Sequence, residues 1–132
     1  MSDQEELAEE KHSAIKTILV VEDDADVGEF FIQALQQETA YQSMLATDGF
    51  QALKIVKSVK PNLFVLDYQL PHMNGIELYD HLHVTEGLEE VPALFMSANL
   101  PTGELEKRRV YYLRKPFELE ELLQKIEELL AE

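Results

Sequence analysis

The stretch "TILVVEDDADV", Thr17 to Val27, decides the fold because a short apolar run ends directly in clustered acids. Ile18–Val21 is apolar at every position, and Glu22, Asp23 and Asp24 follow at once. Short apolar runs usually stop at Gly, Pro or Asn, which turn the chain easily. Adjacent carboxylates repel one another, so this cluster needs a reason beyond chain reversal.

Three further runs have the same character, and each is too short for a helix. Runs without polar alternation are typical of strands that are buried on both faces, as in a parallel sheet. We therefore expect strands at Ile18–Val21, Leu63–Leu66, Ala93–Met96 and Val110–Leu113, with a weaker strand within Tyr41–Thr47.

Helical patterns separate these runs. Val27, Phe30, Phe31, Ala34 and Leu35 recur at the spacing of one helix face. Strand and helix alternate five times, which predicts an open α/β domain with helices on both faces of the sheet. We expect that domain at residues 15–132, after a flexible acidic tail at residues 1–14.

Composition excludes several classes of function. The chain has 132 residues, a net charge of −15 and no cysteine, so we expect neither disulfides nor direct contact with nucleic acid. No apolar run is long enough to span a membrane, and the acidic N-terminus does not resemble a signal peptide. A cytoplasmic protein is the expectation.

The polar residues that follow the strands predict a site. Glu22 and Asp23 follow the first strand, Asp67 the third, Ser97 the fourth and Lys115 the fifth. The carboxyl ends of parallel strands meet at one edge of an open sheet, where ligands bind. Two carboxylates about 4 Å apart repel by roughly 4 kcal/mol, so the three acids favour a Mg²⁺ site. A carboxylate there can attack phosphorus, and Asp67 is the best candidate.

Each residue also has a simpler interpretation. Asp24 or Asp26 would cap the following helix, and Asp67 would serve in an ordinary turn. Lys115 would be a solvated lysine, and Tyr112 a packing residue.

Four fragments in order, "ILVVEDD", "LFVLDYQLPHMNG", "MSA" and "RKPF", resemble the receiver domain of two-component response regulators. The resemblance covers about Lys16 to Leu130. It implies a flavodoxin-like, five-stranded parallel sheet of order 2-1-3-4-5 and a cis peptide between Lys115 and Pro116. It also implies that a sensor histidine kinase or a phosphotransfer protein phosphorylates Asp67.

The resemblance assigns further expected roles. Glu22, Asp23, Asp67 and the backbone carbonyl of Gln69 would hold Mg²⁺, while Ser97 and Lys115 would bind phosphoryl oxygens. Ser97 and Tyr112 would switch conformation, and the side chains of Gln69 and Asn99 would tune the lifetime of the phosphate.

We expect a stand-alone phosphoacceptor switch with a downstream protein target, as a monomer or a phosphorylation-dependent dimer. It would take phosphoryl groups from phosphodonors and slowly release them, without being a conventional enzyme. Two alternatives stay open: a Mg²⁺-dependent phosphatase or hydrolase, and a phosphorylation-independent binding module. Hydrolases of that type carry an acid–base aspartate two residues after the nucleophile, where this chain has Gln69.

One segment departs from the resemblance. Only 17 residues separate Ser97 from Lys115, several fewer than the family implies. Gly103 weakens helix propagation, and Leu105 is the one apolar residue of "ELEKRR". We expect a fourth helix of at most about two turns, or an irregular loop.

Overall fold

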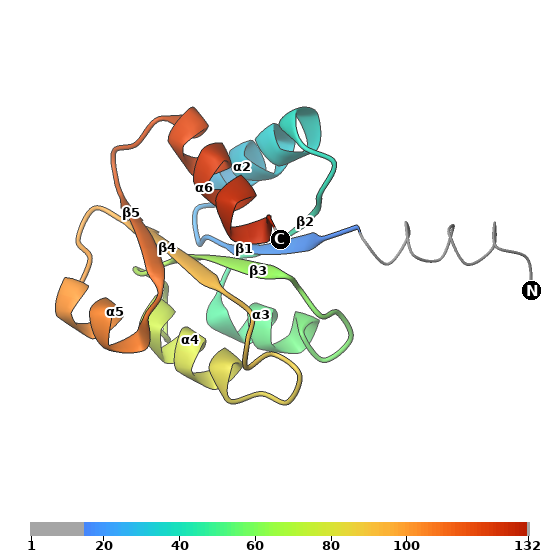
Figure 1. Ribbon diagram of the computed structural model, residues 1–132. Helices are drawn as coiled ribbons and strands as arrows, with labels where there is room; N and C mark the ends of the chain where they lie inside the picture. Colours follow the sequence, from blue (N-terminus) through green and yellow to red (C-terminus); the bar gives the residue numbers. More distant parts are fainter. Residues whose placement is uncertain (1–14, 132) are drawn as a thin grey trace, which may run out of the picture.

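The computed structural model describes residues 15–131, so the expected tail at residues 1–14 lies outside the described residues (Figure 1). Among the described residues, no helix is both long and apolar enough to cross a bilayer. The elements are β1 (Thr17–Val21), α2 (Ala25–Glu38), β2 (Gln42–Ala46), α3 (Gly49–Ile55), β3 (Leu63–Asp67), α4 (Gly75–His83), β4 (Ala93–Ser97), α5 (Thr102–Arg108), β5 (Tyr111–Arg114) and α6 (Leu119–Leu130).

The five strands form one parallel sheet in the order β2-β1-β3-β4-β5, which confirms the expected topology. In the register of the sheet, Val20 of β1 lies between Leu45 of β2 and Val65 of β3. The strand order reverses direction at β1 and β3, so their carboxyl ends open the crevice where open α/β sheets bind ligands.

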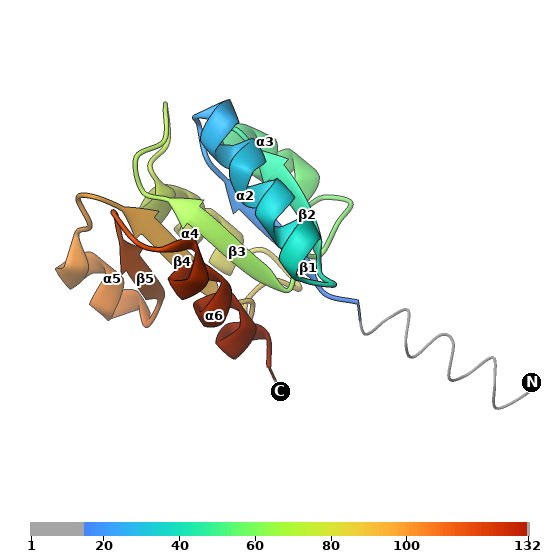
Figure 2. The ribbon, with the colours of Figure 1, turned by 90° about the horizontal axis from the view of Figure 1, so that it is seen from above.

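Alternate residues of the central strands enter two separate cores. Leu19 and Val21 pack on the side of α3, α4 and α5, whereas Ile18 and Val20 pack on the side of α2 and α6. Figure 2 shows α2 and α6 lying over one face of the sheet. Burial on both faces explains why β1, β3 and β4 lack polar alternation.

The expectation of burial on both faces is wrong for the last strand. The strand begins at Tyr111 and ends at Arg114, at the edge of the sheet, and its residues are exposed or half-buried. An edge strand has a neighbouring strand on one side only, so its side chains are covered less than those of a central strand. Tyr111 and Tyr112 are therefore exposed.

The fourth helix in chain order, α5, has seven residues, or about two turns, which confirms the expected short helix. Leu105 is its one buried residue, and among the described residues no side chain caps its first turn at Pro101. The helix ends at Arg109, which adopts the left-handed conformation with a φ of 56°.

Candidate functional site

The acids after β1 divide into two groups by their contacts. The carboxylate of Asp24 caps α2 by accepting hydrogen bonds from the amides of Asp26 and Val27 at 3.0 and 3.2 Å. This observation confirms the capping interpretation for Asp24 alone. Glu22 and Asp23 take no part in that cap, so they remain available for the site.

The third carboxylate comes from β3. Asp67 is the last residue of the strand, and its side chain is buried. Its Oδ1 accepts a hydrogen bond from the amide of Gln69 at 3.0 Å. One carboxylate oxygen each from Glu22, Asp23 and Asp67 lie within 4.8 Å of one another. Strand ends far apart in sequence thus deliver three acids to one point.

The ammonium of Lys115 lies between two of these acids. Lys115 Nζ is 3.3 Å from Glu22 Oε1 and 3.4 Å from Asp67 Oδ2. The amide of Lys115 donates to the carbonyl of Ser97 at 2.9 Å, which anchors the residue after β5. The Lys115–Pro116 peptide is cis, as the resemblance implies.

Burial and charge perturb these groups strongly. Burial, together with the neighbouring Asp67 carboxylate, raises the pKa of Glu22 from 4.5 to about 7. Burial alone would lower the pKa of Lys115, but the carboxylates of Asp67 and Glu22 offset it and raise the pKa. One ammonium does not neutralise three carboxylates, and an all-oxygen ligand set suits a hard divalent cation. The residues therefore fit the expected Mg²⁺ site.

The remaining predicted residues surround this cluster. Ser97 ends β4, is buried, and accepts a hydrogen bond at Oγ from the amide of Asn99 at 3.3 Å. The side chains of Gln69 and Asn99 are exposed. Tyr112 lies on β5 opposite Phe95 of β4, with 38% of its surface exposed.

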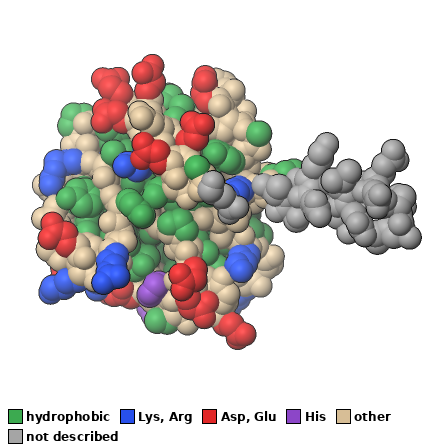
Figure 3. All heavy atoms as spheres, viewed as in Figure 1, with side chains coloured by type: hydrophobic (Ala, Val, Ile, Leu, Met, Phe, Trp, Pro, Cys, Tyr) green, Lys and Arg blue, Asp and Glu red, His purple; other side chains and the backbone are tan. Residues whose placement is uncertain are grey.

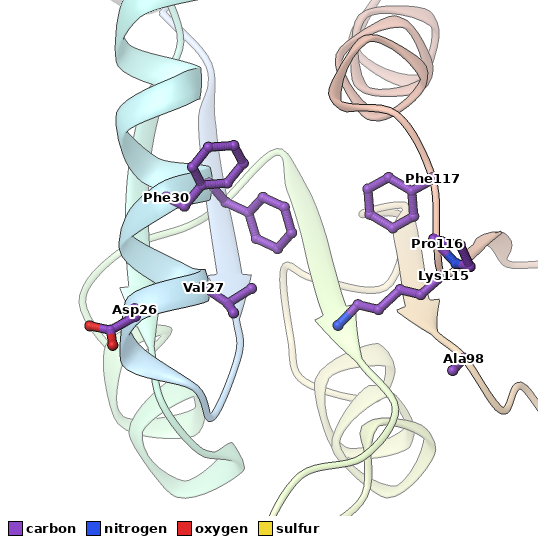
Figure 4. Close-up of a pocket in the computed structure, with 8 residues that line it drawn as sticks. Asp26, Val27, Phe30, Ala98, Lys115, Pro116 and Phe117 are labelled. Carbon is purple, nitrogen blue, oxygen red and sulfur yellow. The ribbon is translucent and has the colours of Figure 1, made fainter.

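An apolar cleft of about 650 Å³ lies beside Lys115, and the sequence did not predict it (Figure 4). Figure 4 shows α2 on one side and the segment from Lys115 to Phe117 on the other, with the lysine side chain reaching across toward β3. The helical spacing predicts a buried Phe30, but 54% of its surface is exposed. The lining residues are Asp26, Val27, Phe30, Phe31, Ala98, Lys115, Pro116 and Phe117.

This geometry defines a class of protein with an open α/β fold and an acidic, lysine-bearing site at the strand ends. The model of the response regulator receiver domain matches residues 18–127. The chain is 35% identical over 113 residues to the DNA-binding response regulator MtrA of Mycobacterium tuberculosis, covering 83% of this chain and 48% of MtrA. The chain thus spans about half the length of the mycobacterial regulators it matches.

Solved structures agree with the fold. Chemotaxis protein CheY4 of Vibrio cholerae has a TM-score of 0.80 at 23% identity, covering 87% of this chain and 98% of CheY4. Response regulator TrrA of Thermotoga maritima, solved in complex with Mg²⁺ and BeF, has a TM-score of 0.76 at 27% identity, covering 87% of this chain and 99% of TrrA. The chain belongs to the receiver domain family of response regulators.

Proposed function

We propose that Asp67 is the phosphoacceptor and that the surrounding residues serve its reaction. The observation that carries this proposal is the cluster of three carboxylates with Lys115 Nζ 3.4 Å from Asp67 Oδ2. Glu22 and Asp67 are both buried and both contact the lysine, but of these two Asp67 is itself the last residue of a central strand, β3. Glu22 is held by the Asp24 amide and Lys115, and Asp23 is exposed.

The proposed reaction moves one phosphoryl group. A carboxylate oxygen of Asp67 attacks the phosphorus of a partner's phosphohistidine, a P–O bond forms, and the P–N bond breaks. The electron pair of that bond stays on the imidazole, which takes a proton. The ammonium of Lys115 and the hydroxyl of Ser97 are placed at neighbouring strand ends to stabilise charge on the phosphoryl oxygens.

Glu22, Asp23 and Asp67 would hold Mg²⁺, together with the backbone carbonyl of Gln69. When bound, the cation would supply charge neutralisation for the phosphoryl oxygens. Lys115 orients the carboxylates of Glu22 and Asp67, and the Gln69 amide fixes the Asp67 side chain. Exposed side chains at Gln69 and Asn99 would control the access of water to the phosphate.

We propose the apolar cleft as the seat of the phosphohistidine-bearing partner, a sensor histidine kinase or a phosphotransfer protein. The cleft adjoins Lys115, so a partner seated there brings its phosphohistidine to Asp67. The rings of Phe31 and Phe117 lie 6.4 Å apart, and exposed Phe30 borders them. In Figure 3, acidic side chains gather over α2 and α6. A helix with apolar side chains flanked by Lys or Arg would fit this surface.

The output would be a protein contact made by the domain in the cytoplasm, where the donor kinase acts. A net charge of −15 disfavours direct contact of this chain with DNA, although the related MtrA is named as DNA-binding. A conventional hydrolase is disfavoured, because Gln69 stands where such an enzyme needs an acid and its side chain is exposed.

An intact mass after incubation with acetyl phosphate and Mg²⁺ tests the proposal. A stable adduct of one phosphoryl group supports the switch. Multiple-turnover release of phosphate would instead support the hydrolase, and neither adduct nor release would support the phosphorylation-independent module. Asp67→Asn in the same buffer is the control, because it keeps the shape of the side chain without its anionic oxygen.

A further inference from the structure

Gly75 lies so close to the backbone at the end of β3 that a residue with a Cβ atom would not fit there. It is the first residue of α4, directly after the capping residue Asn74. Its amide donates to the carbonyl of Tyr68 at 2.8 Å. A Cβ added at this position would lie 2.5 Å from the carbonyl oxygen of Asp67, 3.0 Å from Tyr68 Cα and 3.1 Å from the ring of Phe95.

Close approach, and not backbone conformation, explains this glycine. The φ of Gly75 lies outside the left-handed region, in contrast to Gly87 with a φ of 89°. An alanine could therefore adopt the backbone angles of Gly75. Alanine would not fit at this position because its Cβ would clash with backbone atoms, which move less easily than the end of a side chain.

Two other glycines provide the comparison. Gly49 is the first residue of α3, directly after its capping residue Asp48, so it holds the same helix position as Gly75. A Cβ at Gly49 would meet the sulfur of Met73 at 2.9 Å, and a thioether side chain adapts readily. A Cβ at Gly103 would meet nothing within 4 Å.

The nearest of these atoms, the carbonyl oxygen of Asp67, belongs to the proposed nucleophile. The Asp67–Tyr68 peptide joins the proposed nucleophile to Tyr68, and the amide of the next residue, Gln69, donates to Asp67 Oδ1 at 3.0 Å. Relief of the clash at Gly75 requires a displacement of about half an ångström, the tolerance within which reacting groups must be held. The displacement would move the carboxylate of Asp67 and the carbonyl of Gln69 together.

We propose that Gly75 is a positioning residue for phosphoryl transfer. Because Gly75 has no Cβ, α4 can pack directly against the Asp67–Tyr68 peptide and hold the Asp67 carboxylate in the position from which it reacts. The inference rests on the proposed function of Asp67. Gly75 is not among the residues proposed to bind the donor or the cation, and it would act through the peptide that follows the nucleophile.

The test compares Gly75→Ala with Gly49→Ala and Gly103→Ala in the full chain. Phosphorylation by acetyl phosphate is followed by intact mass across a Mg²⁺ series, at a temperature where every variant is folded by circular dichroism. We expect Gly75→Ala to react about tenfold or more slowly than the wild type and to need more Mg²⁺ for half of its maximal rate. Gly49→Ala and Gly103→Ala should stay within about threefold of the wild-type rate, since neither Cβ meets backbone.

Several outcomes would overturn the inference. One is a Gly75→Ala rate and Mg²⁺ requirement equal to those of Gly49→Ala. Another is a lower melting temperature with an unchanged Mg²⁺ requirement, which indicates a purely structural role. Gly75→Ala combined with Phe95→Leu removes the ring contact and keeps the carbonyl contact, so the double variant should remain slow. Recovery of the wild-type rate in the double variant would show that the close approach serves core packing. Failure of Gly75→Ala and of the double variant to fold would show the same.

Failure of this inference is separable from failure of the proposed function. An unlabelled wild type would contradict the phosphoacceptor assignment itself. A labelled wild type with an equally fast Gly75→Ala variant would contradict only the positioning by Gly75.

Discussion

Arg108 of α5 and Asp80 of α4 form a bidentate ion pair, with Nε–Oδ1 and Nη2–Oδ2 separations of 2.8 and 2.9 Å. Arg108 also reaches Glu104 one turn earlier at 3.1 Å. The hydrogen bond from Arg108 holds the pKa of Asp80 below its ordinary value. Together with buried Leu105, this contact attaches α5 to the rest of the domain.

Residues 99–109 should exchange amide hydrogens fastest outside the termini in the unphosphorylated protein, and should slow on phosphorylation. Arg108→Met should accelerate this exchange further and lower stability by at most about 1 kcal/mol, since the pair is partly exposed. Lys107→Met is the matched control, because Lys107 is mostly exposed and its ion pair with Glu104 of the same helix has a longer separation of 3.7 Å. Protection across 99–109 comparable to that of α6 would contradict this prediction.

The raised pKa of Glu22 predicts how metal-free stability depends on pH. Between its ordinary pKa of 4.5 and its folded pKa of about 7, the folded protein binds a proton that the unfolded chain releases. The contribution of Glu22 therefore lowers the free energy of unfolding as the pH rises from about 4.5 to about 7. Glu22→Gln should gain stability relative to the wild type between about pH 5 and pH 8, by up to about 3 kcal/mol.

Thermal melts in chelator measure the difference, with Glu29→Gln on the exposed face of α2 as the matched control. Mg²⁺ should reduce the advantage of Glu22→Gln, because a cation favours the charged carboxylate. A stability difference that stays constant across the pH range would show that Glu22 is not the titrating group.

Mg²⁺ should raise the melting temperature of the unphosphorylated protein in a concentration-dependent way, by mass action on the folded state. Asp23→Ala should remove most of that rise, because Asp23 supplies an exposed carboxylate to the cluster. Asp26→Ala removes a nearby exposed acid outside the cluster and should respond like the wild type. An unchanged Mg²⁺ response in Asp23→Ala would move the metal site elsewhere.

Phe30→Ala should slow phosphoryl transfer from a phosphorylated histidine phosphotransfer protein by about tenfold, because exposed aromatic residues anchor protein contacts. The reaction of this variant with acetyl phosphate should be unchanged, since Phe30 lines the apolar cleft proposed to seat the partner and is not in the carboxylate cluster. Phe50→Ala is the control, because Phe50 is 57% exposed on α3 and does not line the cleft. Equal losses in both variants would argue against docking at the cleft.

The sequence predicted the sheet and the convergence of the site well, for a physical reason. Apolar runs without polar alternation are typical of strands buried in a parallel sheet, and the carboxyl ends of such a sheet bring Glu22, Asp67 and Lys115 together. The short α5 was predictable because only 17 residues separate Ser97 from Lys115, and these residues must also form β5 and the connecting loops.

Side-chain relations between distant elements could not be predicted. The spacing of Phe30 matches a buried helix face, but its neighbours Phe31 and Ile32 occupy the core. Arg108 and Asp80 lie on two different helices and are 28 residues apart in the sequence, so no helical periodicity connects them. Nothing in the local sequence around Gly75 indicates that its Cβ would meet the carbonyl of Asp67.

The most direct measurement of the central claim identifies which carboxylate carries the phosphoryl group. Borohydride reduces an aspartyl phosphate to homoserine, so peptide mass spectrometry after reaction with acetyl phosphate and reduction locates the modified residue. We predict homoserine at position 67 alone in the wild type and no adduct in Asp67→Asn, which should fold and melt at or above the wild-type temperature in metal-free buffer. Reduction at Asp23 or Asp24, or labelling of Asp67→Asn at full yield, would contradict the assignment of Asp67.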